Sequence, residues 1–268
     1  MARAKRHFLP GHAWHITHRC HEKQFLLKFG RDRDRWLHWL FEARKRYKLC
    51  ILNYVATSNH IHLLVMDRSE REAIPRSMQL AAGRTGQEYN HRKLRKGAFW
   101  EDRYHATAVQ TGEHLIRCMV YMDLNMVRAG AVQHPSEWDT CGYNEIQSPK
   151  KRYGLIDHNC LLELLGLSSM GALEAAHGRW VEQAIEAGEK RREEKWTGAI
   201  AVGGRSFVEE VKGRLNIRAK GRRVIEQAED CCLREGQDAY GAIFQGEKGT
   251  LSPGNMHYWN IYNEESIG

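Results

Sequence analysis

The sequence contains no apolar run long enough to cross a membrane, and no apolar segment follows its basic N-terminus. A helix needs about 20 consecutive apolar residues to span a bilayer, so the first absence argues against a membrane protein. The second absence argues against a secretory signal peptide. We therefore expect a cytoplasmic protein without a membrane partner.

Cysteine is present, but not in the spacing that binds zinc. Five of the seven cysteines are scattered singly and two are adjacent, so no C-x-x-C pair occurs. An odd number of unpatterned thiols is typical of a reducing compartment. We interpret them as buried thiols with no part in metal binding.

The excess positive charge is confined to the first half of the chain. Residues 1–148 contain 24 Lys and Arg against 15 Asp and Glu, whereas residues 149–268 contain 17 against 18. The net charge of +8 therefore comes from the first half. Such a basic half is typical of a protein that binds a polyanion, most often nucleic acid. A basic soluble surface without a partner is the alternative.

The hydrophobic pattern of the first half predicts four strands and three helices. In one segment (32–47), apolar side chains recur at helical spacing, with acidic residues first and basic residues last, as the helix dipole favours. Two apolar strands joined by a three-residue polar turn predict a hairpin. The expected strands are 12–20, 49–56, 60–67 and 103–109, and the expected helices are 32–47, 71–95 and 113–130.

This order, β-α-β-β-α-β-α, predicts an α+β fold of the split βαβ class, an antiparallel sheet with helices on one face. Past residue 131 the pattern weakens, and Pro135, Ser148 and Pro149 indicate a linker. We expect one domain at residues 1–148 and a mainly helical region at 149–268. The helices of that second region are expected near residues 160–195 and 206–235.

A pair of histidines lies in the second strand of the expected hairpin. Alternate side chains of a strand point the same way, so His60 and His62 share one face of the sheet. Two neighbouring imidazoles on a rigid strand form half of a divalent-metal site. Two idle histidines on an exposed strand face would give the same pattern.

The helix 113–130 has two different faces. An apolar stripe, which should pack on the sheet, consists of Leu115, Cys118, Met119, Met122 and Met126. The other face carries His114, Arg117, Tyr121, Asn125 and Arg128. Tyr121 and Asn125 are neighbours there, because they are four residues apart. A tyrosine that only anchors the edge of a helix would also fit.

Taken together, the histidine pair and the tyrosine helix form a plausible reaction site. A phenol is a poor nucleophile at neutral pH without help from its surroundings. A cation held by His60, His62 and the Asn125 amide oxygen would polarise a scissile phosphate. Arg117 and Arg128 would offset charge on the phosphoryl oxygens.

Three ordered motifs resemble those of the REP-associated tyrosine transposases, relatives of the single-tyrosine HUH transposases of insertion sequences. The motifs are NHIHLLV (59–65), FWEDRYHATAV (99–109) and YMDLNMVRAG (121–130). The resemblance covers about residues 8–147. It implies a ferredoxin- or RRM-like HUH palm, in agreement with the order of strands and helices.

The resemblance also implies the chemistry. His60 and His62 would bind Mg²⁺ or Mn²⁺, and Asn125 would complete the metal site. Tyr121 would attack single-stranded DNA, form a 5′-phosphotyrosine link and leave a free 3′-OH. The substrates of this family are hairpins from short palindromic repeats, so hairpin DNA is the expected partner. Relatives act as monomers or as homodimers.

For contacts with the DNA backbone we expect a basic cluster at the end of the 71–95 helix and just beyond it. The candidates are Arg84, Arg92, Lys93, Arg95, Lys96 and Arg103. A solvated, charged helix end is the alternative.

This chain has Thr57-Ser58 where the family often has Met-Pro, and Met126 where it often has proline. Neither difference removes a catalytic atom.

The leading hypothesis is therefore a site-specific, divalent-metal-dependent single-strand DNA endonuclease and strand-transferase. A domesticated relative that binds hairpins without cutting them is the first alternative. The second is a hydrolytic metalloenzyme that uses the histidine pair and water as the nucleophile. It would release free 5′-phosphate ends and tolerate the loss of Tyr121.

Overall fold

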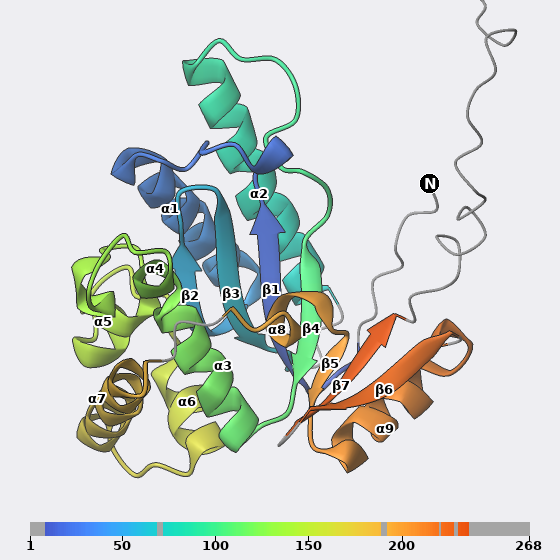
Figure 1. Ribbon diagram of the computed structural model, residues 1–268. Helices are drawn as coiled ribbons and strands as arrows, with labels where there is room; N and C mark the ends of the chain where they lie inside the picture. The colour runs from blue at the N-terminus through green and yellow to red at the C-terminus, as the bar shows by residue number, and fades with distance from the viewer. Residues whose placement is uncertain (1–8, 69–71, 189–191, 220, 228–229, 236–268) are drawn as a thin grey trace, which may run out of the picture. The chain divides into compact units, whose positions relative to one another are not determined.

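A computed structural model describes residues 9–68, 72–188, 192–219, 221–227 and 230–235 (Figure 1). In these ranges the chain builds one seven-stranded sheet with the strand order β2-β3-β1-β4-β5-β7-β6. The fold is α+β with a mostly antiparallel sheet, as the sequence predicts. Among the helices of the described ranges, none is long and apolar enough to cross a membrane.

The first half follows the predicted order of elements. The strands are β1 (Ala13–Arg19), β2 (Cys50–Ala56), β3 (His60–Met66) and β4 (His105–Val109). The helices are α1 (Gly30–Tyr47), α2 (Ala73–Arg92) and α3 (Glu113–Asp123), with a short 3-10 turn at His21–Lys23. β2 and β3 form the predicted antiparallel hairpin, and β1 lies between β3 and β4. The predicted elements of this half are therefore confirmed, except that the helix expected at 113–130 is interrupted.

Helices cover both faces of the sheet rather than one. In Figure 1, α1 and α2 pack together behind the sheet, while α3 and the short helix α8 (Lys195–Gly198) lie in front of it. β1 is buried on both sides, with Trp14 and Ile16 on one face and Ala13 and His15 on the other. A strand buried on both faces must be covered twice.

The helix expected at 113–130 is divided in two. α3 ends at Asp123, and α4 (Asn125–Arg128) follows after Leu124. The interruption is slight, since the Leu124 N–H still bonds the Val120 carbonyl at 3.0 Å. Gly130 ends the segment in the left-handed region, with φ of +67°, as expected for a helix-terminating glycine.

After the 3-10 turn Pro135–Glu137, three helices follow on either side of residue 148. These are α5 (Gly142–Gln147), α6 (His158–Leu165) and α7 (Met170–Glu186). The helix expected near 160–195 is therefore interrupted. Gly166 adopts a left-handed conformation that ends α6, and the Ser169 side chain caps the start of α7.

The prediction of a helix at 206–235 is wrong beyond residue 215. After β5 (Ala201–Gly203), α9 (Arg205–Leu215) ends at Asn216, whose φ is +47°, and the 3-10 turn Asn216–Ala219 follows. The chain then forms an antiparallel hairpin of β6 (Arg222–Gln227) and β7 (Asp230–Glu235). The basic composition of this segment conceals its strands, because the apolar side chains that alternate along them are few.

These last strands continue the sheet of the first half. β5 pairs in parallel with β4, and β7 pairs with β5. Part of the region after residue 148 therefore shares a sheet with the region before it. The division into domains at residue 148 stays a prediction. Residues 236–268 of the second predicted domain lie outside the described ranges.

A buried polar network ties α3 to the second half. Both oxygens of the Asp123 carboxylate are engaged, one by the Asn53 amide at 2.9 Å and the other by His177 Nε2 at 2.8 Å. Asn53 belongs to β2 and His177 to α7, and both are fully buried. Because an unpaired buried carboxylate is costly, this network fixes the end of α3 just before Asn125.

Candidate catalytic site

A cavity of about 540 Å³ opens where β1 and β3 meet the end of α3, α4 and α8. It brings together, from separate parts of the chain, the predicted metal ligands, the predicted nucleophile and two of the arginines predicted to contact DNA. Those that line it are His60, His62, Arg103, Tyr121, Asn125 and Arg128. The sequence prediction that the histidine pair and the tyrosine helix share one place therefore agrees with the geometry.

His60 is held by the turn that precedes its strand. Its Nδ1 lies 2.6 Å from Asn59 Oδ1 and 2.9 Å from Thr57 Oγ1. Asn59 Nδ2 donates to the Lys23 carbonyl, which directs Oδ1 toward the ring. The His60 Nδ1–H therefore donates to Asn59, and the lone pair remains on Nε2.

His62 is held by a chain of hydrogen bonds that ends at a backbone carbonyl. His15 Nδ1 lies 2.8 Å from the Trp196 carbonyl oxygen, and His15 Nε2 lies 2.8 Å from His62 Nδ1. A carbonyl oxygen only accepts, so His15 carries its proton on Nδ1 and accepts from the His62 Nδ1–H. His62 therefore also presents the lone pair of Nε2, and the planes of the two rings differ by only 9°.

Burial keeps these imidazoles neutral. It lowers the pKa of His15 and that of His60 to about 4, because the charged ring loses its hydration. Burial, together with the neighbouring His60 and His15, lowers the pKa of His62 well below its usual value. At pH 7 both candidate ligands are therefore unprotonated, which is the state that binds a metal.

Asn125, the first residue of α4, lies beside Nε2 of His62. Its Nδ2 lies 3.0 Å from His62 Nε2 and donates to the lone pair there. If the Asn125 amide turned by half a revolution, Oδ1 would take the place of Nδ2. His62 Nε2 and Asn125 Oδ1 would then be neighbouring candidate ligands. Within the described ranges, no cluster of three or more His, Cys, Asp or Glu side chains is placed to hold a metal. A site here therefore requires the amide.

Tyr121 lies in the wall of the cavity and is almost fully buried. Its ring centroid is 6.2 Å from that of His62. The Arg128 guanidinium lies 4.1 Å from the centre of the tyrosine ring, and it also donates to the Tyr121 carbonyl oxygen at 2.6 Å. Burial raises the pKa of Tyr121, while the charge of Arg128 opposes this shift. The phenol is consequently protonated at neutral pH.

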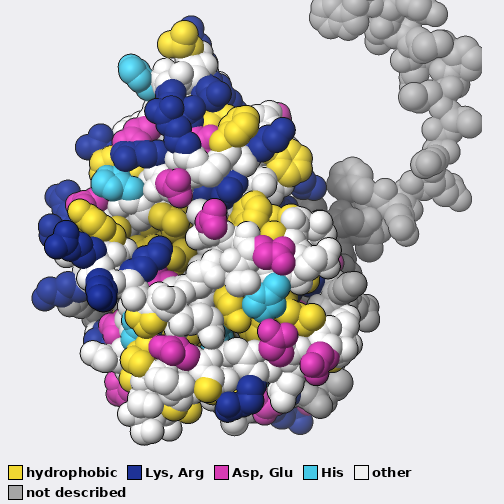
Figure 2. All heavy atoms as spheres, turned by 90° about the vertical axis from the view of Figure 1, so that its left-hand side faces the viewer, with side chains coloured by type: hydrophobic (Ala, Val, Ile, Leu, Met, Phe, Trp, Pro, Cys, Tyr) yellow, Lys and Arg dark blue, Asp and Glu magenta, His cyan; other side chains and the backbone are white. Residues whose placement is uncertain are grey.

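The predicted DNA-contacting cations divide into two groups. Arg103 and Arg128 line the cavity, but the basic cluster at the end of α2 does not. Lys and Arg side chains gather in the upper half of the face in Figure 2, at the height of α1 and α2 in Figure 1. The cluster consists of Arg84, Arg92, Lys93, Arg95 and Lys96. Its role in DNA binding stays a prediction.

Several members of this cluster have structural partners, among them Arg95, which donates to the Ala98 carbonyl at 2.9 Å. Arg92 forms an ion pair with the buried Asp32, and Arg84 lies 5.3 Å from the centre of the Trp39 ring. Arg117 of α3 is also outside the catalytic cavity. It bonds Asp230 at 3.2 Å and Glu113 at 2.5 Å. The structure therefore does not place Arg117 beside the histidines.

The cavity also contains residues that the sequence did not single out. Asp102 lies within the motif 99–109, and Arg19 lies in the first expected strand (12–20), which carries no motif. Arg192 and Thr197 come from beyond residue 148. No local pattern connects these two to a strand more than 120 residues earlier, so only the fold reveals them.

Comparison with known proteins gives one family match and two similar solved structures. Residues 10–123 match the family model described as IS200-like transposases. Among solved structures, the chain is similar to a REP-associated tyrosine transposase bound to a REP hairpin, at 16% identity and a TM-score of 0.46. That match covers 56% of this chain and 87% of the other.

A second similar structure is a protein described as a transposase from Deinococcus radiodurans. It shares 14% identity, with a TM-score of 0.32, and the match covers 41% of this chain and 87% of the other. No curated protein sequence matches the chain.

The family match runs from just before β1 to the last residue of α3. It therefore includes His15, the histidine pair and Tyr121, and it ends two residues before Asn125. The matched range thus includes several of the residues that line the cavity, while Asn125, Arg128 and Arg192 lie beyond it. Over residues 10–123, the sequence is therefore similar to the IS200-like transposases.

Proposed function

We propose that this protein is a divalent-metal-dependent, site-specific single-strand DNA endonuclease and strand-transferase. Its substrates are hairpins of repeated palindromic sequences, and Tyr121 forms a 5′-phosphotyrosine intermediate. One observation carries the proposal: His60 and His62 both present Nε2 in the cavity that also contains Asn125 and Tyr121.

The residues fit a divalent cation. Two neutral imidazole nitrogens and an amide oxygen are an acceptable donor set for Mn²⁺ or Mg²⁺, and oxygens of the DNA phosphate and water would complete it. When bound, the cation polarises the scissile phosphate and offsets its charge. Asn59 and His15 supply the second hydrogen bond that orients each ligand ring.

The side chains around Tyr121 prepare it for attack. The tyrosine oxygen forms a bond to phosphorus, the bond to the 3′-oxygen breaks, and that oxygen leaves with the electron pair and takes a proton. Because the phenol is protonated at neutral pH, its own proton must pass to water during the step. Arg128 lies over the ring and favours the phenolate, while Arg103 and Arg192 supply further positive charge in the cavity.

One chain supplies all of these groups. The tyrosine helix and both histidines meet within one chain, which supports action as a monomer. A homodimer that exchanges tyrosine helices would need α3 to leave its place. The Asp123 network with Asn53 and His177 opposes such a movement.

The test is a covalent adduct assay with hairpin oligonucleotides of repeated palindromes and Mn²⁺. We expect a protein–DNA adduct that survives denaturation, requires the metal and is absent from Tyr121→Phe. An adduct that persists in Tyr121→Phe would show that the nucleophile is another residue. Tight, chelator-insensitive binding without cleavage would instead indicate a binding protein. Free 5′-phosphate ends from Tyr121→Phe would indicate hydrolysis by water.

A further inference from the structure

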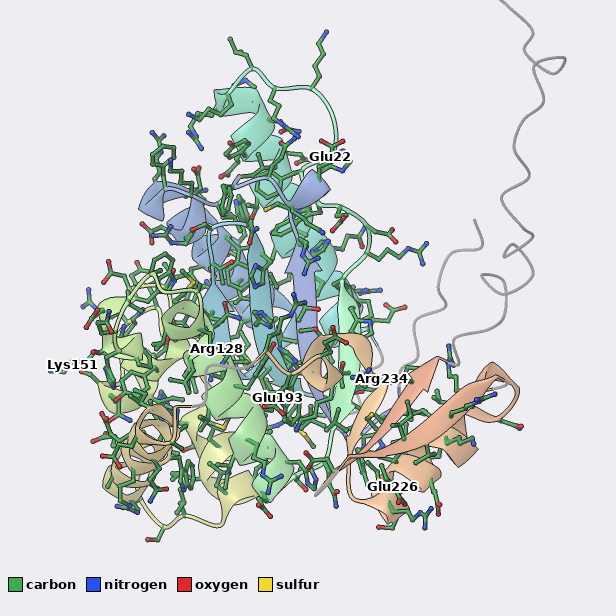
Figure 3. All side chains as sticks on the ribbon, in the orientation of Figure 1. Glu22, Arg128, Lys151, Glu193, Glu226 and Arg234 are labelled. Atoms are coloured by element: carbon green, nitrogen blue, oxygen red, sulfur yellow. The ribbon has the colours of Figure 1, made fainter. Side chains whose placement is uncertain are left out.

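A second, larger hollow of about 1010 Å³ adjoins the catalytic cavity. Tyr121, Arg128 and Arg192 line both, so the proposed nucleophile stands in the wall that the two spaces share. Figure 3 shows Arg128, Glu193 and Arg234, which belong to this second hollow, across the middle of the molecule. The rest of its lining comes mainly from α3, α7 and the segment that leads into α8.

The lining of this hollow combines positive charge with apolar and aromatic surface. Five cations face two carboxylates, and the half-buried Trp180 lies beside Ile116 and Val120. The cations are Arg117, Arg128, Arg192, Lys195 and Arg234, and the carboxylates are Glu193 and Glu194. A basic groove with an aromatic ring is the usual surface for single-stranded nucleic acid, because phosphates bind the cations and a base stacks on the ring.

These cations are not all equally committed to protein partners. Lys195 is engaged by Asp230 at 2.7 Å and also by Glu193, so it belongs to the wall. Arg234 lies 3.9 Å from Glu194 and adjoins the Cys232 thiol, and its buried Nε has no oxygen or nitrogen acceptor in the described part of the chain. This guanidinium can therefore donate to a phosphate oxygen that enters the hollow.

A strand cut at an internal phosphate must continue on both sides of the nucleophile. We propose that the second hollow binds the single-stranded flank on one side of the scissile phosphate, an inference that rests on the proposed function. Arg192 and Arg234 contact its phosphates, and one of its bases stacks on Trp180. Because α7 and β7 follow the family-matched residues 10–123, this assigns a role to the region after residue 148.

The experiment measures binding by the full-length Tyr121→Phe protein, which cannot form the adduct. The probes are one palindromic hairpin without a tail, with a short 5′ oligothymidine tail, and with a short 3′ oligothymidine tail. Fluorescence anisotropy gives the affinity for each. We expect Trp180→Ala to weaken binding of one tailed probe by roughly 5- to 150-fold, the measured range for a lost base–aromatic stack. Binding of the tail-less hairpin should stay unchanged.

Arg234→Gln tests the same surface without removing an aromatic side chain from the packing. It should weaken binding of the same tailed probe. The affinity should also depend less on salt concentration, because one phosphate contact is lost. Arg205→Gln is the matched control, since Arg205 is an exposed, ion-paired arginine on α9 outside both hollows. Circular dichroism confirms that each variant is folded.

The proposal is overturned if Trp180→Ala and Arg234→Gln leave all three affinities unchanged, or weaken the tailed and tail-less probes equally. Its failure is distinguishable from that of the proposed function. An adduct with wild-type protein but no effect of the tails refutes only this binding site. A tail effect without any adduct refutes only the cleavage.

Discussion

Replacing His15 with phenylalanine should weaken metal binding although His15 is not itself a candidate ligand. Phenylalanine keeps a buried ring of similar size but removes both nitrogens. The His62 Nδ1–H would lose its acceptor, and its ring would be free to take the other tautomer or to turn. The Trp196 carbonyl would still have a donor within reach, because Thr107 Oγ1 lies 3.2 Å away and can turn its single proton to it from the Ala199 carbonyl. The effect therefore falls on His62.

The expected magnitude follows from the position of His15 behind a metal ligand. Loss of the residue that orients a ligand histidine lowers metal affinity by about 10- to 100-fold. This corresponds to about 1.4 to 2.7 kcal/mol, since each tenfold change is about 1.4 kcal/mol. The buried Nδ1–H left without an acceptor also destabilises the fold by roughly 1–3 kcal/mol. Metal affinity and stability must therefore both be measured.

His15→Gln is the matched variant, because its amide can accept from His62 and donate to the Trp196 carbonyl. Manganese binding followed by electron paramagnetic resonance gives the affinities, and nitrogen-15 NMR of labelled histidine reports the tautomer of His62. We expect the order wild type, glutamine, phenylalanine in decreasing affinity. If His15→Phe is folded and binds Mn²⁺ within twofold of wild type, the hydrogen-bond chain does not orient the ligand.

Three further predictions concern α3 and α4. Asn125→Ala should weaken Mn²⁺ binding about tenfold or more, while Asn125→Asp should restore or exceed wild-type affinity in the same titration because it supplies a charged oxygen ligand. Arg128→Gln should raise the pKa of Tyr121, so the rate of adduct formation should begin its rise at higher pH; an unshifted pH profile would contradict this. His177→Leu should cost about 3–5 kcal/mol in urea unfolding, because Asp123 loses a buried partner. Adding Asp123→Asn should recover part of that loss, and no recovery would mean that packing alone is responsible.

The sequence predicted the features that depend on local periodicity. Alternation along β3 placed His60 and His62 on one face, and helical spacing placed Tyr121 near Asn125. The order of strands and helices in the first half followed from the same short-range patterns. These patterns succeed because the side chains concerned lie within one element or in elements joined by a short turn.

The features that escaped prediction depend on long-range contacts. His15 and Trp196 are 181 residues apart and meet through a backbone carbonyl, which leaves no trace in residue type. The hairpin of β6 and β7 was hidden by its charged composition, and its strands are stabilised by pairing with β5 rather than by their own pattern. Tertiary context decides such segments, and propensity alone does not.

The strand pairing beyond residue 148 has a direct consequence for the chemistry of the first half. The N–H groups of Ala108 and Gln110 bond the carbonyls of Ile200 and Val202 at 2.8 and 3.0 Å, which fixes β5 beside β4. α8 immediately precedes β5, so this pairing also fixes the Trp196 carbonyl against His15. A small displacement of β5 would break that 2.8 Å hydrogen bond and release the ring of His62. The proposed metal site is therefore completed by a region beyond the family-matched residues 10–123.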